Sequence, residues 1–281
     1  MRASLRIGFT SLAALAALTL GSDLALAVEG SYAVPEQIGL MPAATEHMQE
    51  IHDFHNLLLV IITVISAFVL GLLLWVMARY NARVNPKPAT WSHNTLIEVI
   101  WTIIPVVILG LIAVPSIRLL YNGEVIPPNV DLTVKAIGHQ WYWAYEYPDQ
   151  GNFTFDARML EGDELKKSGE PRLLAVDNRV VVPVGKTVRM IITSQDVIHS
   201  WTIPAFGVKI DGVPGKLNET WFKAEREGIF YGQCSELCGV NHAFMPIAVE
   251  VVSQERFDQW VEEAKTKFAN SDSAPSALAA R

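Results

Sequence analysis

The chain has 281 residues, which is enough for one large domain or two ordinary ones. Hydrophobic residues make up 51% of it and charged residues only 18%, a balance that excludes a disordered chain. The mean hydropathy of +0.25 indicates concentrated apolar segments. The 29 acidic residues outnumber the 22 basic ones, so the chain has no overall basic surface, which excludes nucleic-acid binding. Its two cysteines are too few for a disulfide-stapled scaffold.

The N-terminal residues 1–27 have the pattern of an export signal. Arg2 and Arg6 precede an apolar run at 12–20, and Ala-Leu-Ala at 25–27 resembles a signal-peptidase site. The competing interpretation is an uncleaved membrane anchor. Because an alanine-rich run this short rarely spans a bilayer, we predict a cleaved signal peptide and an exported chain.

Two long apolar runs follow. Residues 57–78 and 99–117 contain no charge, and at about 1.5 Å per residue each is long enough to cross a hydrocarbon core of about 30 Å. Neither run has the polar stripe expected of a buried helix in a soluble domain. We therefore predict a transmembrane hairpin over residues 28–123, with helices at about 52–80 and 95–121.

The segment between the two predicted helices sets their orientation. Residues 79–88 carry three basic and no acidic side chains, so the positive-inside rule places this loop in the cytoplasm and both chain ends outside. Glu98 then lies at the cytoplasmic start of the second helix, where a carboxylate is either a boundary residue or a proton site. Pro105 and Pro115 are expected to bend that helix, whose freed backbone groups need partners on other helices.

From residue 124 onward, short β-branched runs alternate with Gly, Pro, Asn and Asp, which is typical of an all-β sandwich or barrel. The predicted strands are 131–137, 140–147, 179–184, 187–194, 199–203, 219–224, 228–233 and 247–252. A C-terminal helix capped by Ser253 is expected to reach about Phe268, and residues 269–281 are expected to be disordered. The second domain is thus predicted at 124–268.

One loop of this domain gathers soft metal ligands. Cys234, Cys238, His242 and Met245 lie within twelve residues, and His199 stands 35 positions before the first cysteine. One Cys, one Met and two His are the ligand set of a mononuclear blue-copper site in a β-sandwich. The second cysteine exceeds that need. The set suits two copper ions that are bridged by both sulfurs, each with one imidazole and one weak axial ligand.

Two other interpretations of these residues compete with copper. The cysteines of an exported domain are able to form a disulfide, but a bridge over so short a loop constrains little of the unfolded chain. It also leaves His199, His242 and Met245 without a role. Zinc accepts Cys and His ligands but has little use for Met. The whole spacing therefore favours copper.

Four motifs carry a family resemblance. The loop 234–245, Gly-His-Gln-Trp-Tyr-Trp at 138–143, Val-Asp-Asn-Arg-Val at 176–180 and His-Ser-Trp at 199–201 resemble bacterial, CuA-containing cytochrome c oxidase subunit II. The likeness covers nearly the whole chain after residue 27, including the helix pair. It implies a cupredoxin-like Greek-key sandwich that follows the transmembrane hairpin and holds the binuclear copper centre CuA.

The resemblance also implies which residues bind metals. Its copper ligands are His199, Cys234, Glu236, Cys238, His242 and Met245. Both cysteines would bridge the coppers. His199 and Met245 would complete one copper, and His242 with the backbone carbonyl of Glu236 would complete the other. The Glu236 side chain would also reach a magnesium ion shared with subunit I.

Further roles are implied by position in the family pattern. Trp141 matches the tryptophan through which electrons enter, although composition alone favours strand packing for this residue. Glu98 matches a glutamate at the mouth of a proton path, which favours the proton site over the boundary residue. Four acids match positions that face the lysine-rich surface of cytochrome c, where the alternative is a solvated acidic surface: Glu146, Asp156, Asp177 and Asp196.

The implied function is that of the electron-accepting subunit of a respiratory oxidase in the bacterial inner membrane. Electrons from cytochrome c would pass through CuA, on the periplasmic side, to haem in subunit I, where oxygen is reduced to water with proton pumping. Subunit I, subunit III and membrane lipid are the expected neighbours. The alternative is a copper-binding, membrane-tethered chaperone or structural module, which would need neither Trp141 nor Glu236.

Overall fold

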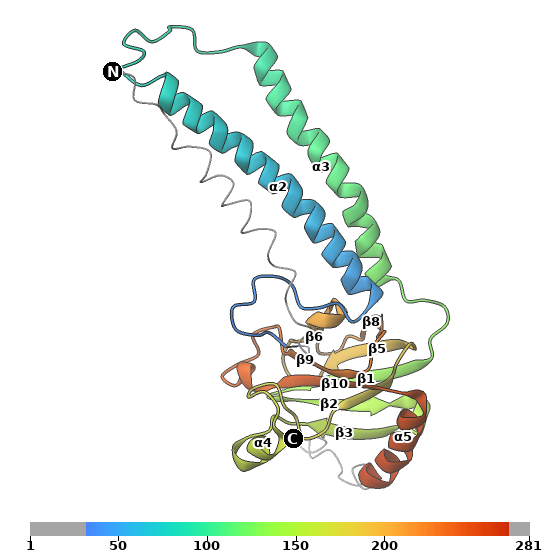
Figure 1. Ribbon diagram of the computed structural model, residues 1–281. Coiled ribbons are helices and arrows are strands. Elements are labelled where there is room, and N and C mark those ends of the chain that lie inside the picture. The colour runs from blue at the N-terminus through green and yellow to red at the C-terminus, as the bar shows by residue number, and fades with distance from the viewer. Residues whose placement is uncertain (1–31, 270–281) are drawn as a thin grey trace.

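The computed structural model describes residues 32–269. The predicted signal peptide at 1–27 and residues 270–281 of the predicted tail lie outside the described part. Two long helices, α2 (Glu46–Arg79) and α3 (Thr95–Glu124), stand side by side on a β-rich domain (Figure 1). Both are long and apolar enough to cross a membrane, and their apolar side chains are mostly exposed.

The hairpin is fixed to the β domain at the start of α2. Thr45 caps the helix by accepting the backbone N–H of Met48, and its hydroxyl donates to the carbonyl of Phe206 at 2.8 Å. Ala44 beside it exchanges backbone hydrogen bonds with Ala205 and Glu225. These contacts explain why α2 begins at Glu46, earlier than the apolar run alone predicts.

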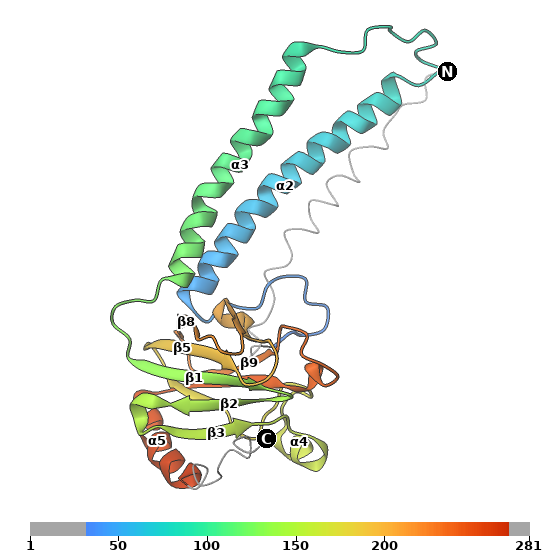
Figure 2. The same cartoon turned by 180° about the vertical axis from the view of Figure 1, so that it is seen from behind.

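The β domain contains three sheets. Figure 2 shows the strands of the largest sheet from behind. The largest has the order β3-β2-β1-β5-β8 and comprises β1 (Leu132–His139), β2 (Tyr142–Tyr147), β3 (Phe153–Ala157), β5 (Thr187–Ser194) and β8 (Asn218–Lys223). The second, of order β4-β10-β9, comprises β4 (Val180–Pro183), β9 (Gly228–Gln233) and β10 (Pro246–Val252). A third is the pair β6 (His199–Ile203) and β7 (Val208–Gly212).

Buried residues of all three sheets meet in one hydrophobic core. Alternate residues of β1 and β5 are buried, as expected for strands with one face on the core. The C-terminal helix α5 (Gln254–Phe268) follows the predicted N-cap Ser253 and buries Phe257, Val261 and Ala264. The predicted fold class is confirmed: two apolar helices, a β-rich domain and a C-terminal helix.

Two strands, one short α-helix and the 3-10 helices were not predicted. β3 and β7 have five residues each, and the helix α4 (Gly162–Ser168) has seven. Elements this short contain too few residues to show a clear hydrophobic periodicity. The short 3-10 helices are η2 (Pro148–Gln150), η3 (Pro204–Phe206) and η4 (His242–Phe244). β3 lengthens the sheet beyond β2, and η4 carries one of the predicted metal ligands.

Candidate metal centre

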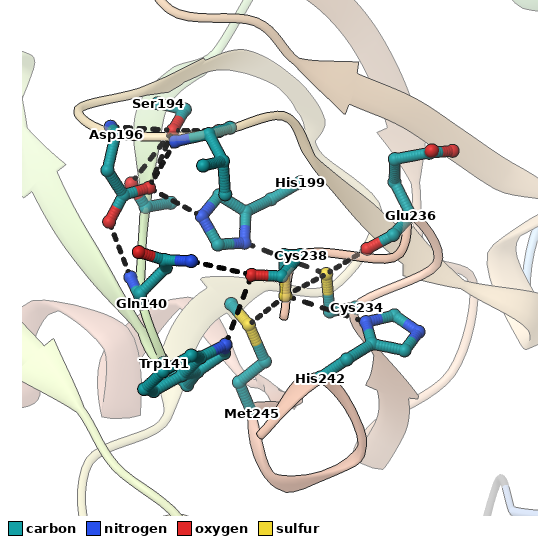
Figure 3. Close-up of polar contacts among 12 residues, drawn as sticks. Gln140, Trp141, Ser194, Asp196, His199, Cys234, Glu236, Cys238, His242 and Met245 are labelled. Carbon is teal, nitrogen blue, oxygen red and sulfur yellow. Dashed lines mark hydrogen bonds and ion pairs between the residues drawn. The ribbon is translucent and has the colours of Figure 1, made fainter. Parts of the chain in front are cut away.

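The predicted ligands lie close together in the folded chain (Figure 3). His199 is the first residue of β6, and the loop 234–245 joins the antiparallel strands β9 and β10. The loop is closed at its base because the N–H of Cys234 donates to the carbonyl of Met245 at 3.3 Å. Ser235 in turn donates to the carbonyl of Ser200 at 2.9 Å, which holds the loop beside β6.

Two thiols form the centre of the cluster. The sulfurs of Cys234 and Cys238 lie 3.9 Å apart, and both cysteines are free, so the predicted alternative of a disulfide is absent from the structure. Nδ1 of His199 lies 3.8 Å from the Cys234 sulfur, and Nδ1 of His242 lies 3.6 Å from the Cys238 sulfur. Sδ of Met245 is 3.5 Å from the Cys238 sulfur. Soft and borderline donors therefore face one another directly.

The surroundings of the cluster are largely dry and make the two thiols unequal. His199, Cys234, Cys238 and Met245 are 0 to 5% exposed. Burial acts to raise the pKa of both thiols. Hydrogen bonds hold the pKa of Cys234 below its usual value, whereas the neighbouring charge of Cys234 raises the pKa of Cys238 further. Cys234 is therefore the thiol that loses its proton more readily.

Glu236 presents two different groups. Its backbone carbonyl oxygen lies 3.4 Å from the Cys234 sulfur and faces the cluster. Its side chain is exposed and points away from the sulfurs (Figure 3). The backbone carbonyl of Glu236 therefore faces the sulfurs, whereas its carboxylate faces solvent.

His199 has a carboxylate partner on its far side. Nε2 of His199 donates to Oδ1 of Asp196 at 2.8 Å, which leaves Nδ1 free to face the sulfurs. Burial acts to raise the pKa of Asp196, but hydrogen bonds from His199, Val197 and Gln140 hold it below its usual value. Gly138 lies against the imidazole, where a Cβ would come within 2.7 Å of the ring.

Trp141 lies between the surface and the cluster. Its indole Nε1–H donates to the carbonyl of Cys238 at 3.2 Å, and Gln140 Nε2 donates to the same oxygen at 2.8 Å. Gln140 was not among the predicted site residues, although it lies within the 138–143 motif. Trp141 also lines a surface hollow of about 380 Å³, together with Met159 and Phe244.

The other predicted docking acids already have partners within the chain. Glu146 pairs across β1 and β2 with Lys135 at 2.9 Å, and Asp156 pairs with Arg158 at 2.8 Å. Asp177 accepts the backbone N–H of Arg158 at 2.7 Å. The strand register places Glu146 and Asp156 on the same face of the sheet. Their role in docking stays a prediction.

Glu98 lies in the helical hairpin, far from this cluster (Figure 1). It lies in the first turn of α3, the helix end that is remote from the β domain (Figure 1). Its Oε1 accepts the backbone N–H of Asn94, the N-cap of α3, at 3.2 Å. The carboxylate is therefore held at the helix start.

Comparisons with known proteins show which family the chain resembles. Residues 132–252 match the family described as "Cytochrome C oxidase subunit II, periplasmic domain", and residues 33–119 match its "transmembrane domain". The probable cytochrome c oxidase subunit 2 of Rickettsia bellii is 53% identical over 241 residues, which are 86% of this chain and 89% of the relative. Cytochrome c oxidase subunit 2 of Zea mays is 50% identical over 234 residues, which are 82% and 90% of the two chains.

Among solved structures, the periplasmic domain of subunit II of cytochrome oxidase of Bradyrhizobium japonicum is 58% identical, with a TM-score of 0.48. It covers 51% of this chain and 99% of its own. The two family matches together cover both the helical hairpin and the β domain. In each of the two relatives, at least half of the aligned residues are identical to those of this chain. The chain therefore belongs to the cytochrome c oxidase subunit II family and is a subunit of an oxidoreductase.

Proposed function

We propose that this chain carries electrons into a respiratory haem-copper oxidase. It takes them from a cytochrome c at a binuclear copper centre and passes them to haem in subunit I, where oxygen is reduced to water with proton pumping. The observation that carries this proposal is the buried contact between the two free thiols at 3.9 Å, with an imidazole Nδ1 beside each of them.

The donor set fits copper better than zinc, because a thioether lies in direct contact with a thiol. The residues that would hold two copper ions are His199, Cys234, Cys238, His242, Met245 and Glu236 through its carbonyl. Bound copper would supply one-electron redox chemistry at this site. The chain places these donors in advance and keeps most of them away from water, which limits rearrangement when the charge changes.

The surface around Trp141 is the proposed docking face for the donor. The indole links this surface to the peptide of Cys238, a proposed copper ligand. Glu146, Asp156 and Asp177 would meet the basic face of a cytochrome c, with part of their charge offset by Lys135 and Arg158. An acidic domain raises the on-rate of a basic partner and makes it sensitive to salt.

The remaining parts of the proposal concern the membrane complex. The two apolar helices would anchor the chain in a bacterial inner membrane, against subunit I, with subunit III and lipid nearby. The β domain would face the periplasm after removal of the signal peptide. The exposed carboxylate of Glu236 would reach a magnesium ion at the border with subunit I.

Metal analysis and donor oxidation test the proposed function. The full-length chain, purified in detergent and loaded with copper, is expected to hold two copper ions with a seven-line hyperfine pattern in electron paramagnetic resonance. Reduced cytochrome c, added without oxygen, should bleach the visible spectrum at a rate that falls with added salt. One copper, bound zinc, or a spectrum that the donor leaves unchanged contradicts the proposal.

Glu98 is proposed to admit protons to a path in subunit I. Its carboxylate lies at the predicted cytoplasmic end of the hairpin, where a carboxylate is a functional candidate. Replacing Glu98 with Gln keeps the oxygen that accepts the N–H of Asn94 but removes the ionisable group. We expect turnover and proton uptake of the assembled oxidase to fall by about tenfold or more, with the copper spectrum unchanged.

The matched control is Glu124→Gln, at the opposite end of the same helix. Both variants remove one negative charge from α3, so a general effect of charge is common to them. Turnover in Glu98→Gln equal to that in Glu124→Gln would identify Glu98 as a boundary residue.

A further inference from the structure

Asp196 is oriented towards the cluster of proposed metal ligands, although the family resemblance implies a docking role for it. Its Oδ1 accepts from His199 Nε2 at 2.8 Å and from the backbone N–H of Val197 at 2.7 Å. Its Oδ2 accepts the backbone N–H of Gln140 at 2.6 Å. The Ser194 hydroxyl lies 3.3 Å from Oδ1. Both carboxylate oxygens are therefore engaged within the chain, and the side chain is 31% exposed.

Gln140 extends this contact to the other side of the cluster. While its backbone N–H binds Asp196, its side-chain amide donates to the carbonyl of Cys238 at 2.8 Å. The two residues thus connect an imidazole donor, His199, with a thiol donor, Cys238, which lies on a different segment (Figure 3). We call Asp196 and Gln140 together the brace.

We infer that the brace positions two of the proposed copper ligands, and that Asp196 acts on His199 and not on the docking donor. A metal-binding histidine is commonly fixed by a carboxylate on its other ring nitrogen, which sets the tautomer and increases its basicity. Here that nitrogen is Nε2, and the ring is 0% exposed in the folded chain, so its partner is the carboxylate and not bulk water. The inference rests on the proposed copper site.

The charge of Asp196 has a predictable sign of effect. A carboxylate close to the cluster stabilises the more positive, oxidised state of bound copper. Its removal is expected to raise the reduction potential and to weaken copper binding by about 10–100-fold, the range found for such supporting groups. Gln140 carries no charge, so its loss is expected to change the spectrum and the affinity more than the potential.

The experiment compares Asp196→Asn and Gln140→Ala with Asp156→Asn in the full-length chain in detergent. Copper affinity by competition with a chelator, the visible and near-infrared spectrum, and the reduction potential are measured for each. Asp156 is the matched control because its carboxylate pairs with Arg158 and, among the described residues, forms no hydrogen bond or ion pair with the proposed ligands. We expect lower affinity and an altered spectrum in both brace variants, a higher potential in Asp196→Asn, and parent values in Asp156→Asn.

The donor kinetics separate positioning from docking. Asp196→Asn should leave the salt dependence of cytochrome c binding unchanged, whereas Asp156→Asn should weaken it. If Asp196→Asn keeps the parental affinity, spectrum and potential but alters the salt dependence, Asp196 is a docking residue and the inference is wrong. Gln140 is exposed, so Gln140→Ala tests the brace even if Asp196→Asn fails to fold. A parent chain that binds no copper contradicts the proposed function itself.

Discussion

Replacing Cys238 with Ser is expected to remove both copper ions from the chain together. The Cys238 sulfur contacts the Cys234 sulfur at 3.9 Å, His242 Nδ1 at 3.6 Å and Met245 Sδ at 3.5 Å, so it lies at the middle of the donor set. A hydroxyl is a harder and shorter donor that does not bridge soft copper as a thiolate does. Copper content and the electron paramagnetic resonance spectrum of the full-length chain measure the loss.

Met245→Leu is the matched control for this result. Met245 is 1% exposed, and Leu conserves its volume at a cost below about 1.5 kcal/mol, so the fold should survive. Only a weak thioether donor is lost. We expect Met245→Leu to keep two coppers with a shifted spectrum. A Cys238→Ser chain that retains the parental two-copper spectrum would exclude bridging by this sulfur.

The ligand loop was predictable because its geometry is local. Four donors within residues 234–245 fall on one connection between antiparallel neighbours, so their spacing alone brings them close together. His199 lies outside this loop, on β6, so local spacing does not place it near the other donors. It was predicted because a second histidine completes the copper ligand set. The helix pair was equally clear, because membrane-spanning length and composition depend on no tertiary contact.

The brace was not predictable in this way. Gln140 and Asp196 are 56 positions apart and meet because β1 and β5 pair in parallel, with Gly138 opposite Ser194. No sequence pattern shows that register. Asp196 was therefore predicted as a docking acid, and only the folded chain shows which atoms its carboxylate contacts.

The docking acids show the same limit in a different form. From composition, Glu146 and Asp156 are free negative charges on an acidic domain. In the structure, the register of β1 and β2 places Lys135 opposite Glu146, and Arg158 turns back onto Asp156. The sign of the domain's charge follows from the sequence, whereas the charge that each residue offers to a partner depends on strand pairing.

Trp141→Phe is expected to slow electron transfer from cytochrome c by about 100-fold while leaving the copper content unchanged. Phe keeps an aromatic ring at the surface but loses the Nε1–H that donates to the carbonyl of Cys238. Small changes in the separation and alignment of reacting groups have effects of about this size. Stopped-flow reduction of the loaded full-length chain at saturating donor measures the rate.

Trp221→Phe is the matched control, because the Nε1 of Trp221 has no hydrogen-bond partner among the described residues and Phe removes no contact of that nitrogen. Measurement at saturating cytochrome c separates electron transfer from docking. A docking defect raises the cytochrome c concentration needed for half-maximal reduction, whereas loss of the electron-transfer route lowers the reduction rate even at saturation. If cytochrome c reduces the Trp141→Phe chain as fast as the Trp221→Phe chain, the electron reaches Cys238 without the indole. The second contact at the same carbonyl, from Gln140, would then be the next route to test.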